Sequence, residues 1–424
     1  MEIDPIDFKR EQKRRIEWTH GCLNCHYLRK CLAMWGFYMI FVFKRYSKIG
    51  MNKHLLGRLV ALIALVAPLA LSAQTDPLFT HFTFNKLFYN PAYAGASGQF
   101  CLNAINHQQW LGYDDESPFL KPQDNQFSIE NKLDAARKNI APVTRGLGFS
   151  APIMVKGNNM GGAFFSLVTD QIGYETATYM KGGGSFAYTM SDGSNIRLGV
   201  DVTNLTKTLD ATKLRYHDPN DPMIPTGVDP GDQHMTFGAG LYYSNPNIED
   251  GAYLGVSSTH LNPQTFSYGP SGTINVTTNR HLYIVGGYKK NNFMGNPSLT
   301  LDPAFLIKTA QSVGGLVKPQ LDLQGLVTWN GLFAGGANIR VYGLGAESVS
   351  LILGYYPPLL GNGPMSDQKL RVGYSYDLTV NNILRNSAGS HELQVNYCFM
   401  FTVPERPVRV FRHPRYMERS PEWD

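Results

Sequence analysis

The stretch QKLRVGYSYDLTV, residues 368–380, alternates residue by residue between two kinds of side chain. The intervening positions are polar, charged or Gly, and the apolar and aromatic set comprises Leu370, Val372, Tyr374, Tyr376, Leu378 and Val380. A period of two is that of a β-strand, in which successive side chains point to opposite faces. The stretch therefore predicts a strand with one face toward an apolar medium and the other toward a polar one.

The same alternation recurs along most of the chain. In residues 391–401 it places Glu392, Gln394, Asn396 and Cys398 on one face and Leu393, Val395, Tyr397, Phe399 and Phe401 on the other. A segment at 126–133 is weaker, and turn residues such as Asn330-Gly331 separate the segments. The remaining predicted strands are 100–110, 144–155, 160–169, 176–190, 195–206, 233–244, 251–260, 277–289, 297–309, 317–329, 332–342 and 347–356.

Composition excludes several classes of protein. Only 17% of the residues are charged, and the chain has 42 Gly, 23 Tyr and 23 Phe, whereas soluble globular domains carry about 25% charged residues and disordered chains have few aromatics. The net charge is +5, but residues 1–73 hold 12 basic and 5 acidic residues, and the remainder holds 26 and 28. The basic character is confined to the N-terminus, so we expect no nucleic-acid partner.

The N-terminal part reads as a leader. Residues 51–73, MNKHLLGRLVALIALVAPLALSA, have a basic start, a short apolar run and a small residue at the end, which is the layout of a secretory signal peptide. We expect cleavage after Ala73, and we interpret residues 1–50 as an upstream extension from an over-long gene model. The alternative, haem attachment at Cys22-x-x-Cys25-His26, fails because this stretch precedes the cleavage site.

The lengths of the gaps between the segments favour a closed membrane barrel. Without 126–133, the long gaps 111–143, 207–232, 261–276 and 310–316 fall on one side and the short gaps on the other; only 357–367 is an exception. Outer-membrane barrels have short periplasmic turns, long outer loops and an even strand number. We therefore predict an all-β, antiparallel transmembrane β-barrel of about 14 strands in the outer membrane. A soluble sandwich or propeller is the alternative, but the chain lacks the internal repeat of a propeller.

This interpretation divides the mature chain into three parts: an N-terminal periplasmic or lumenal segment at 74–98, the barrel at 99–403 and a periplasmic tail at 404–424. The N-terminal segment is rich in Phe and Tyr and lacks β alternation. We expect it at the periplasmic mouth, where it either folds into the lumen as a partial plug or forms a plain strap.

Two stretches resemble a known family. QTDPLFTHFTFNKLFYNPAYAGASG at 74–98 and RVGYSYDLTVNNILRNSAGSHELQVNYCF at 371–399 resemble the PorP/SprF family of outer-membrane proteins associated with type IX secretion in Bacteroidota. The loop 111–143 and the tail after Val403 depart from it. The residues that carry the resemblance are Phe84, Asn85, Asn90, Pro91, Ala92, Tyr93, Gly95, Gln109, Trp110, Gly389, His391 and Glu392.

The resemblance implies a non-enzymatic barrel that assists export or surface attachment of cargo proteins, in the setting of protein secretion and gliding motility. It also implies two protein partners: a periplasmic peptidoglycan-associated protein of the secretion system, and secreted cargo with a C-terminal sorting domain. Outer-membrane lipid would surround the barrel. The alternatives are a general channel or porin and an outer-membrane lipid hydrolase.

The residues themselves indicate no catalytic, cofactor or metal site. The chain has no G-x-S-x-G, H-E-x-x-H or P-loop pattern. A hydrolase would have to use histidines such as His107, His260, His281 or His391, which are scattered. A calcium site at Asp218, Asp221, Asp229 and Asp232 is the less favoured interpretation of a loop whose Asp-Pro turns explain it equally well.

The predicted mature chain contains two cysteines, Cys101 in the first predicted strand and Cys398 in the last. Barrel closure makes these strands neighbours, and both cysteines fall on the expected lumen face. A disulfide between them would staple the seam in an oxidising compartment, provided that the register brings them together.

Overall fold

The computed structural model describes residues 76–113, 140–213, 231–245, 251–268, 274–312, 315–343, 345–359, 365–380, 383–384 and 387–401. The chain divides into two units, Met1–Ala67 and Pro68–Asp424, and all described residues belong to the second. The predicted signal peptide, the upstream extension, segment 126–133 and the tail at 404–424 lie outside the described residues.

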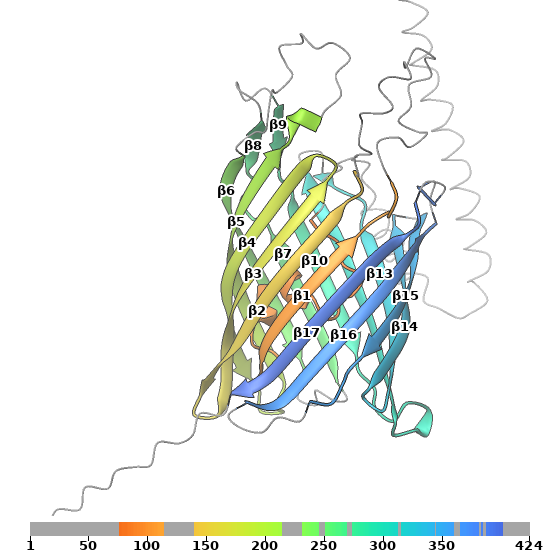
Figure 1. Cartoon of the computed structure of the whole chain (residues 1–424). Helices are drawn as coiled ribbons and strands as arrows, with labels where there is room; N and C mark the ends of the chain where they lie inside the picture. The colour runs from red at the N-terminus through yellow and green to blue at the C-terminus, as the bar shows by residue number, and fades with distance from the viewer. Residues whose placement is uncertain are drawn as a thin grey trace, which may run out of the picture. The chain divides into compact units, whose positions relative to one another are not determined.

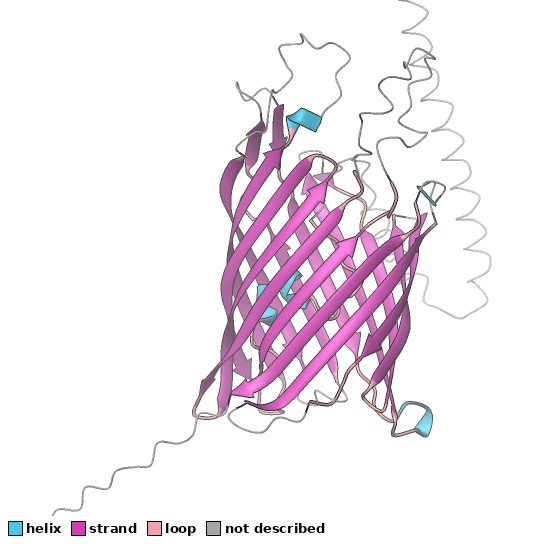
Figure 2. Ribbon diagram, in the orientation of Figure 1, coloured by secondary structure: helices cyan, strands magenta, loops and turns pink. Residues whose placement is uncertain are grey.

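Fourteen antiparallel strands form a closed barrel, as predicted (Figure 1, Figure 2). Each strand pairs with its neighbour in the chain, and the ring closes where β1 pairs with β17. The barrel strands are β1 (Phe100–Gln108), β2 (Val143–Val155), β3 (Asn158–Ile172), β4 (Glu175–Thr189), β5 (Asn195–Leu209), β6 (Asp232–Ser244), β7 (Ala252–Thr259), β10 (Arg280–Tyr288), β11 (Leu299–Ser312), β13 (Gln320–Trp329), β14 (Phe333–Tyr342), β15 (Gly345–Tyr355), β16 (Met365–Thr379) and β17 (Ser390–Phe401).

The alternation in the sequence becomes an inside and an outside of the wall. Ser375 and Glu392 face inward and are fully buried, whereas Leu351 and Leu353 face outward with 63% of their surface exposed. Apolar side chains on the outer surface suit contact with lipid. A closed barrel also pairs its backbone groups within the sheet, so that they need no water. The outward rings of Trp329, Phe333 and Tyr355 follow one another across three strands, as in an interfacial aromatic girdle.

The two ends of the barrel differ. Strand β1 starts and strand β17 finishes at the same end, which also carries the turns at 156–157 and 330–332. We refer to it as the periplasmic end because short turns face the periplasm in such barrels. The other, outer end carries the long connections, a tight turn at 173–174 and the short link from β14 to β15.

Two predicted loops contain additional strands. In the range 261–276, expected to be a loop, β8 (Thr265–Tyr268) pairs with β9 (Ile274–Thr277), and we call this pair the β8–β9 hairpin. Phe266 and Tyr268 of the hairpin are buried against Leu205 of the wall. A further short strand, β12 (Gly315–Leu316), pairs with the end of β11. Strands of two to four residues are too short to give a readable period.

The described helices are short. They are α3 (Lys86–Tyr89) and the 3-10 helices η1 (Pro91–Tyr93), η2 (Ala211–Lys213) and η3 (Phe293–Gly295). Among the described residues, no helix has the length and apolar character needed to cross a membrane.

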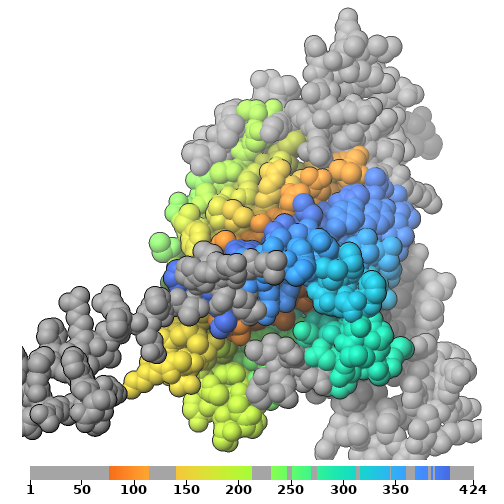
Figure 3. All heavy atoms as spheres, turned by 60° about the horizontal axis from the view of Figure 1, so that its bottom comes forward, coloured from red at the N-terminus to blue at the C-terminus, as the bar shows by residue number. Residues whose placement is uncertain are grey.

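A disulfide joins the first and last strands at the seam. Cys101 and Cys398 lie directly opposite each other in the β1–β17 ladder, with Cα atoms 4.1 Å apart and sulfur atoms 2.06 Å apart. The space-filling view shows the orange first strand beside the blue last strand (Figure 3). The bond closes a loop that spans 297 positions of the sequence.

We predict that the disulfide changes gel mobility and stability. The wild-type barrel should migrate faster without reductant than with it, and Cys101→Ser and Cys398→Ser should both abolish the part of the shift due to this bond. Each variant should lower the free energy of unfolding by about 2–4 kcal/mol, because the long loop is no longer closed. Equal mobility of wild type and Cys101→Ser without reductant would contradict the bond.

Candidate functional site

Residues 76–99 lie inside the barrel, and we call them the plug. Asp76 contacts Thr259 and His281 near the outer end, whereas Gly95 contacts Ser150 toward the periplasmic end. The segment lies within the lumen, one of the two arrangements considered from the sequence, and its first half reaches well past the periplasmic mouth. The plug starts near the outer strand ends and runs down the lumen to β1.

The aromatic side chains of the plug form the core of the lumen. Phe79, Phe82, Phe88 and Tyr89 are each at most 8% exposed. The rings of Phe79 and Phe88 lie 5.3 Å apart, and the Tyr89 ring lies 5.1 Å from that of Tyr283 in the wall. This packing explains why the segment is rich in Phe and Tyr without alternating.

The centre of the plug turns at Asn90. Its backbone is extended, as expected for a residue before proline, and it separates α3 from η1. Its Oδ1 accepts the N–H of Ala92 at 2.9 Å, and its Nδ2 donates to the carbonyl of Leu241 at 3.0 Å. One side chain therefore caps the 3-10 turn and fastens it to β6.

The irregular backbone of the plug makes turn hydrogen bonds within itself and depends on the wall for many of the others. A buried carbonyl without a partner is costly, and most plug carbonyls have no β-ladder to satisfy them. Side chains of the wall donate to these carbonyls instead: Lys308 to Asp76, His107 to Leu78, Gln324 to Thr80, Asn103 to Phe84, Lys181 to Phe88, Ser257 to Tyr89, Ser185 and Arg197 to Ala94, and Asn159 to Gly95.

Glu392 of β17 accepts hydrogen bonds from N–H groups of the plug. Its carboxylate accepts the N–H of Thr80 at 2.8 Å, the N–H of His81 at 2.7 Å and Nδ1 of the His81 ring at 2.7 Å. Beside it, Asp377 of β16 accepts the hydroxyl of Thr80 at 2.6 Å. Hydrogen bonds to a charged acceptor are roughly twice as strong as neutral ones, so this is a firm attachment of the plug to the seam region.

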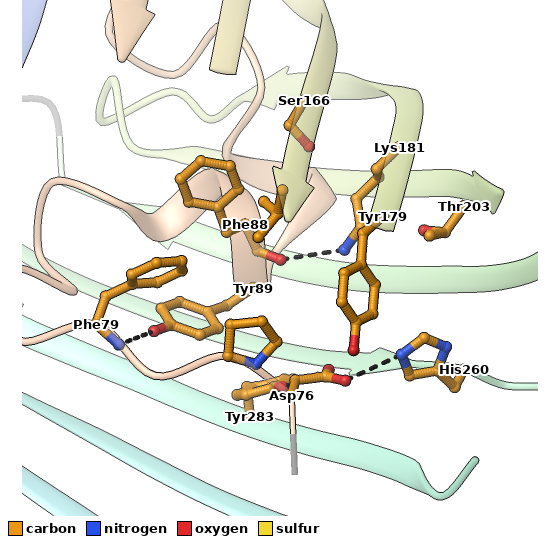
Figure 4. Close-up of a pocket in the computed structure, with 12 residues that line it drawn as sticks. Asp76, Phe79, Phe88, Tyr89, Ser166, Tyr179, Lys181, Thr203, His260 and Tyr283 are labelled. Atoms are coloured by element: carbon orange, nitrogen blue, oxygen red, sulfur yellow. Dashed lines mark hydrogen bonds and ion pairs between the residues drawn. The ribbon is translucent and has the colours of Figure 1, made fainter. Parts of the chain in front are cut away.

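Asp76 attaches the start of the plug to the opposite wall. Its Oδ2 accepts the hydroxyls of Tyr283 at 2.7 Å and Thr259 at 2.9 Å, and its Oδ1 lies 3.0 Å from Nε2 of His260 (Figure 4). Burial opposes ionisation of this carboxyl, but His281 and His260 hold its pKa well below the usual range. Asp76 is therefore a carboxylate at neutral pH.

Lys86 is a buried cation of the plug. Its Nζ lies 3.6 Å from the centre of the Tyr253 ring, a cation–π contact with the wall. Burial lowers the pKa of Lys86 to about 8, although nearby Asp302 acts in the opposite direction.

Glycines of the wall leave room for the backbone of the plug. A Cβ at Gly199 would lie 2.2 Å from the Ala92 nitrogen, and one at Gly162 would lie 2.5 Å from the Ala94 carbonyl carbon. At Gly240 a Cβ would lie 2.1 Å from Oδ1 of Asn90. Part of the glycine excess in the sequence therefore has a local cause, because the plug contacts the bare main chain of the strands.

The residues that carry the family resemblance fall into two groups. The plug group meets in the lumen and comprises Phe84, Asn85, Asn90, Pro91, Ala92, Tyr93, Gly95 and Glu392. The rim group lies at the outer end and comprises Gln109, Trp110, Gly389 and His391. In the rim group, Trp110 donates its N–H to Ser390 at 3.1 Å and Leu111 donates to the carbonyl of Gly389 at 2.7 Å.

The first strand was predicted to end at Trp110 but ends at Gln108. Trp110 has a left-handed backbone with φ of 48°, which does not fit a strand. His391 faces outward and contacts the hydroxyl of Tyr374 at 2.7 Å. Of the acidic loop considered for calcium, Asp232 begins β6 and contacts His234, while Asp218, Asp221 and Asp229 lie outside the described residues.

Sequence reasoning missed the residues of the wall that hold the plug. These include His107, Lys181, Arg197, Asp377 and the wall glycines, together with Asp76 and Thr80 of the plug itself. Inward polar positions are expected in any such barrel, so their polarity gave no signal. The one signal in the sequence was that Lys181, Arg197 and Asp377, which are charged, stand at lumen-facing positions, where the structure buries them.

Comparison with known proteins identifies the family. The family described as type IX secretion system membrane protein PorP/SprF matches residues 71–397, which include the plug and nearly all of the barrel. The chain belongs to the PorP/SprF family. Together with the barrel fold, membership places the protein in the outer membrane, and it implies partners within the secretion system.

Several solved outer-membrane proteins are similar in fold at low identity. A Pseudomonas aeruginosa FadL homologue has 11% identity and a TM-score of 0.40 and covers 77% of this chain and 95% of its own. The monoaromatic hydrocarbon channel CymD has 8% identity, a TM-score of 0.41, and coverages of 76% and 99%. The Ralstonia pickettii toluene transporter TbuX has 10% identity, a TM-score of 0.41, and coverages of 75% and 94%. No curated protein sequence matches the chain.

We predict that Gly199→Ala loosens the plug and that Gly148→Ala does not. Both glycines face the plug, but a Cβ at Gly148 would make ordinary contact with Phe88 at 3.7 Å, whereas one at Gly199 would overlap Ala92. Overpacking of this kind costs about 1–3 kcal/mol. Hydrogen exchange of residues 90–95 should accelerate in Gly199→Ala alone, and equal exchange in the two variants would contradict the packing.

Proposed function

We propose that the protein is a non-enzymatic component of the type IX secretion system that assists export or surface attachment of cargo proteins. Family membership supports the setting, and the carrying observation is the plug attached to opposite walls of the lumen by Asp76 and Glu392. A plug held on opposite sides of the lumen favours a scaffold over a conduit for cargo proteins.

The proposal includes contact with a periplasmic peptidoglycan-associated partner and with the C-terminal sorting domain of cargo. The tail at 404–424 is the segment that we propose for the periplasmic contact. It follows the last strand, whose end lies at the periplasmic end of the barrel, and it carries five Arg and four acidic residues. These charges suit a docking segment for a water-exposed protein surface.

Deletion of the gene tests the function directly. We expect loss of cargo proteins from the secreted and surface proteomes, restored by the wild-type chain. A chain that lacks residues 404–424 should form a heat-modifiable barrel but should not restore the cargo or co-purify with peptidoglycan-linked proteins. The matched control is Gly148→Ala, which should restore both.

A different outcome would favour the channel alternative. If the deletion strain kept a normal surface proteome and lost only uptake of small solutes, the secretion proposal would be wrong. If the chain without its tail co-purified with peptidoglycan-linked proteins at the wild-type level, the proposed contact through the tail would be wrong. The role in secretion would still be judged by the proteome of the deletion strain.

A further inference from the structure

Three side chains that are distant in sequence meet where the plug begins. Asp76 is the first described residue of the plug, His260 follows the last residue of β7, and His281 is the second residue of β10. One ligand atom of each lies within 4.8 Å of the other two. His260 has a left-handed backbone with φ of 52°, which is uncommon for a residue with a side chain and often marks a functional position.

The distances fit the coordination of a small ion. Oδ1 of Asp76 lies 3.0 Å from Nε2 of His260 and 3.4 Å from Nδ1 of His281. A tetrahedral ion with bonds of about 2.0–2.2 Å to nitrogen and oxygen holds its ligands at about this separation. Two imidazoles and one carboxylate are ligands that Zn²⁺ and similar divalent ions prefer.

The surrounding residues hold two of the three groups, Asp76 and His260, in place. The hydroxyls of Tyr283 and Thr259 both donate to Oδ2 of Asp76, which leaves Oδ1 directed at the histidines. The other ring nitrogen of His260, Nδ1, contacts the hydroxyl of Thr236 at 3.0 Å. Partners of this kind fix ligand orientation and tautomer in metal sites.

A cavity adjoins the cluster. It has a volume of about 40 Å³ and is lined by Asp76, Tyr179 and His260 on this side and by Phe88 and Ser166 on the other (Figure 4). A water molecule needs about 10–15 Å³ when volume is measured in this way. There is thus space for water beside Asp76 and His260.

We propose that Asp76, His260 and His281 bind a divalent transition-metal ion that fastens the start of the plug to the wall. The ion would bridge the plug to β7 and β10, and water from the adjoining cavity would complete its coordination. This site is a departure from the sequence analysis, which expected no metal. The 184 positions that separate Asp76 from His260 hide it from any spacing motif.

Binding has identifiable costs. The N–H of Asp76 donates to Nε2 of His281 at a long 3.3 Å, an arrangement that places the ring proton on Nδ1. An ion at Nδ1 requires that proton to leave and the ring to change tautomer, which sacrifices this hydrogen bond. Lys308, which donates to the main-chain carbonyl of Asp76, places an opposing positive charge nearby.

Metal content of purified variants tests the site. The full chain is purified from outer membranes in detergent, stripped with EDTA, exposed to Zn²⁺ and dialysed. Wild type should retain about one Zn²⁺ per chain more than His260→Gln or His281→Gln. The control is His234→Gln, a half-buried histidine outside the cluster, which should match wild type. Because the comparison is between variants of the same chain, any ion held by Cys22, Cys25 or Cys31 cancels.

A variant of Tyr283, which contacts Asp76 but is not one of the three proposed ligands, makes the test independent of folding defects. Tyr283→Phe keeps the ring but removes the hydroxyl that donates to Asp76, and it should weaken Zn²⁺ binding about 10-fold. Heat-modifiable migration in the gel establishes that each variant forms the barrel. Equal metal content in wild type, His260→Gln and His281→Gln would overturn the proposal, as would a wild-type chain that retains no Zn²⁺ at all. The test does not depend on the role in secretion.

Discussion

Inside the closed barrel, the irregular backbone of the plug must find hydrogen-bond partners for its buried N–H and carbonyl groups. Residues 76–99 have little regular structure, yet they lie where water is scarce. Every buried N–H and carbonyl there needs a partner. Lysine, arginine, histidine, amide and hydroxyl groups of the wall supply the donors, and Glu392 supplies the acceptor for two successive N–H groups.

This constraint accounts for both polarity and glycine in the wall. Lys181 and Arg197 are nearly fully buried, which is unfavourable for a cation unless it has a partner, and their partners are plug carbonyls. Gly199 and Gly162 allow the plug main chain to approach the strands closely enough for these bonds to form. Wall and plug therefore fit each other closely, and the motif around Asn90 is the part of the plug that lies against the wall glycines.

The barrel strands could be predicted from the sequence because alternation is a pattern among neighbouring residues. Alternation in 368–380 and 391–401 places each side chain on a face, and the structure has the same faces. The alternation of long and short gaps between the segments was enough to count the strands. The contacts of the plug could not be predicted, because each joins residues that are far apart: Thr80 and Glu392 are separated by 312 positions. The β8–β9 hairpin was missed because strands this short have no readable period.

We infer that the plug closes the lumen through its contacts with the wall, and planar-bilayer conductance measures whether it does. The wild-type barrel should conduct little or nothing, whereas a chain that lacks residues 76–97 should form a barrel with large, steady openings. Glu392→Ala, which leaves the N–H groups of Thr80 and His81 without their acceptor, should give intermittent openings. The same low conductance in wild type and in the chain without the plug would contradict the account.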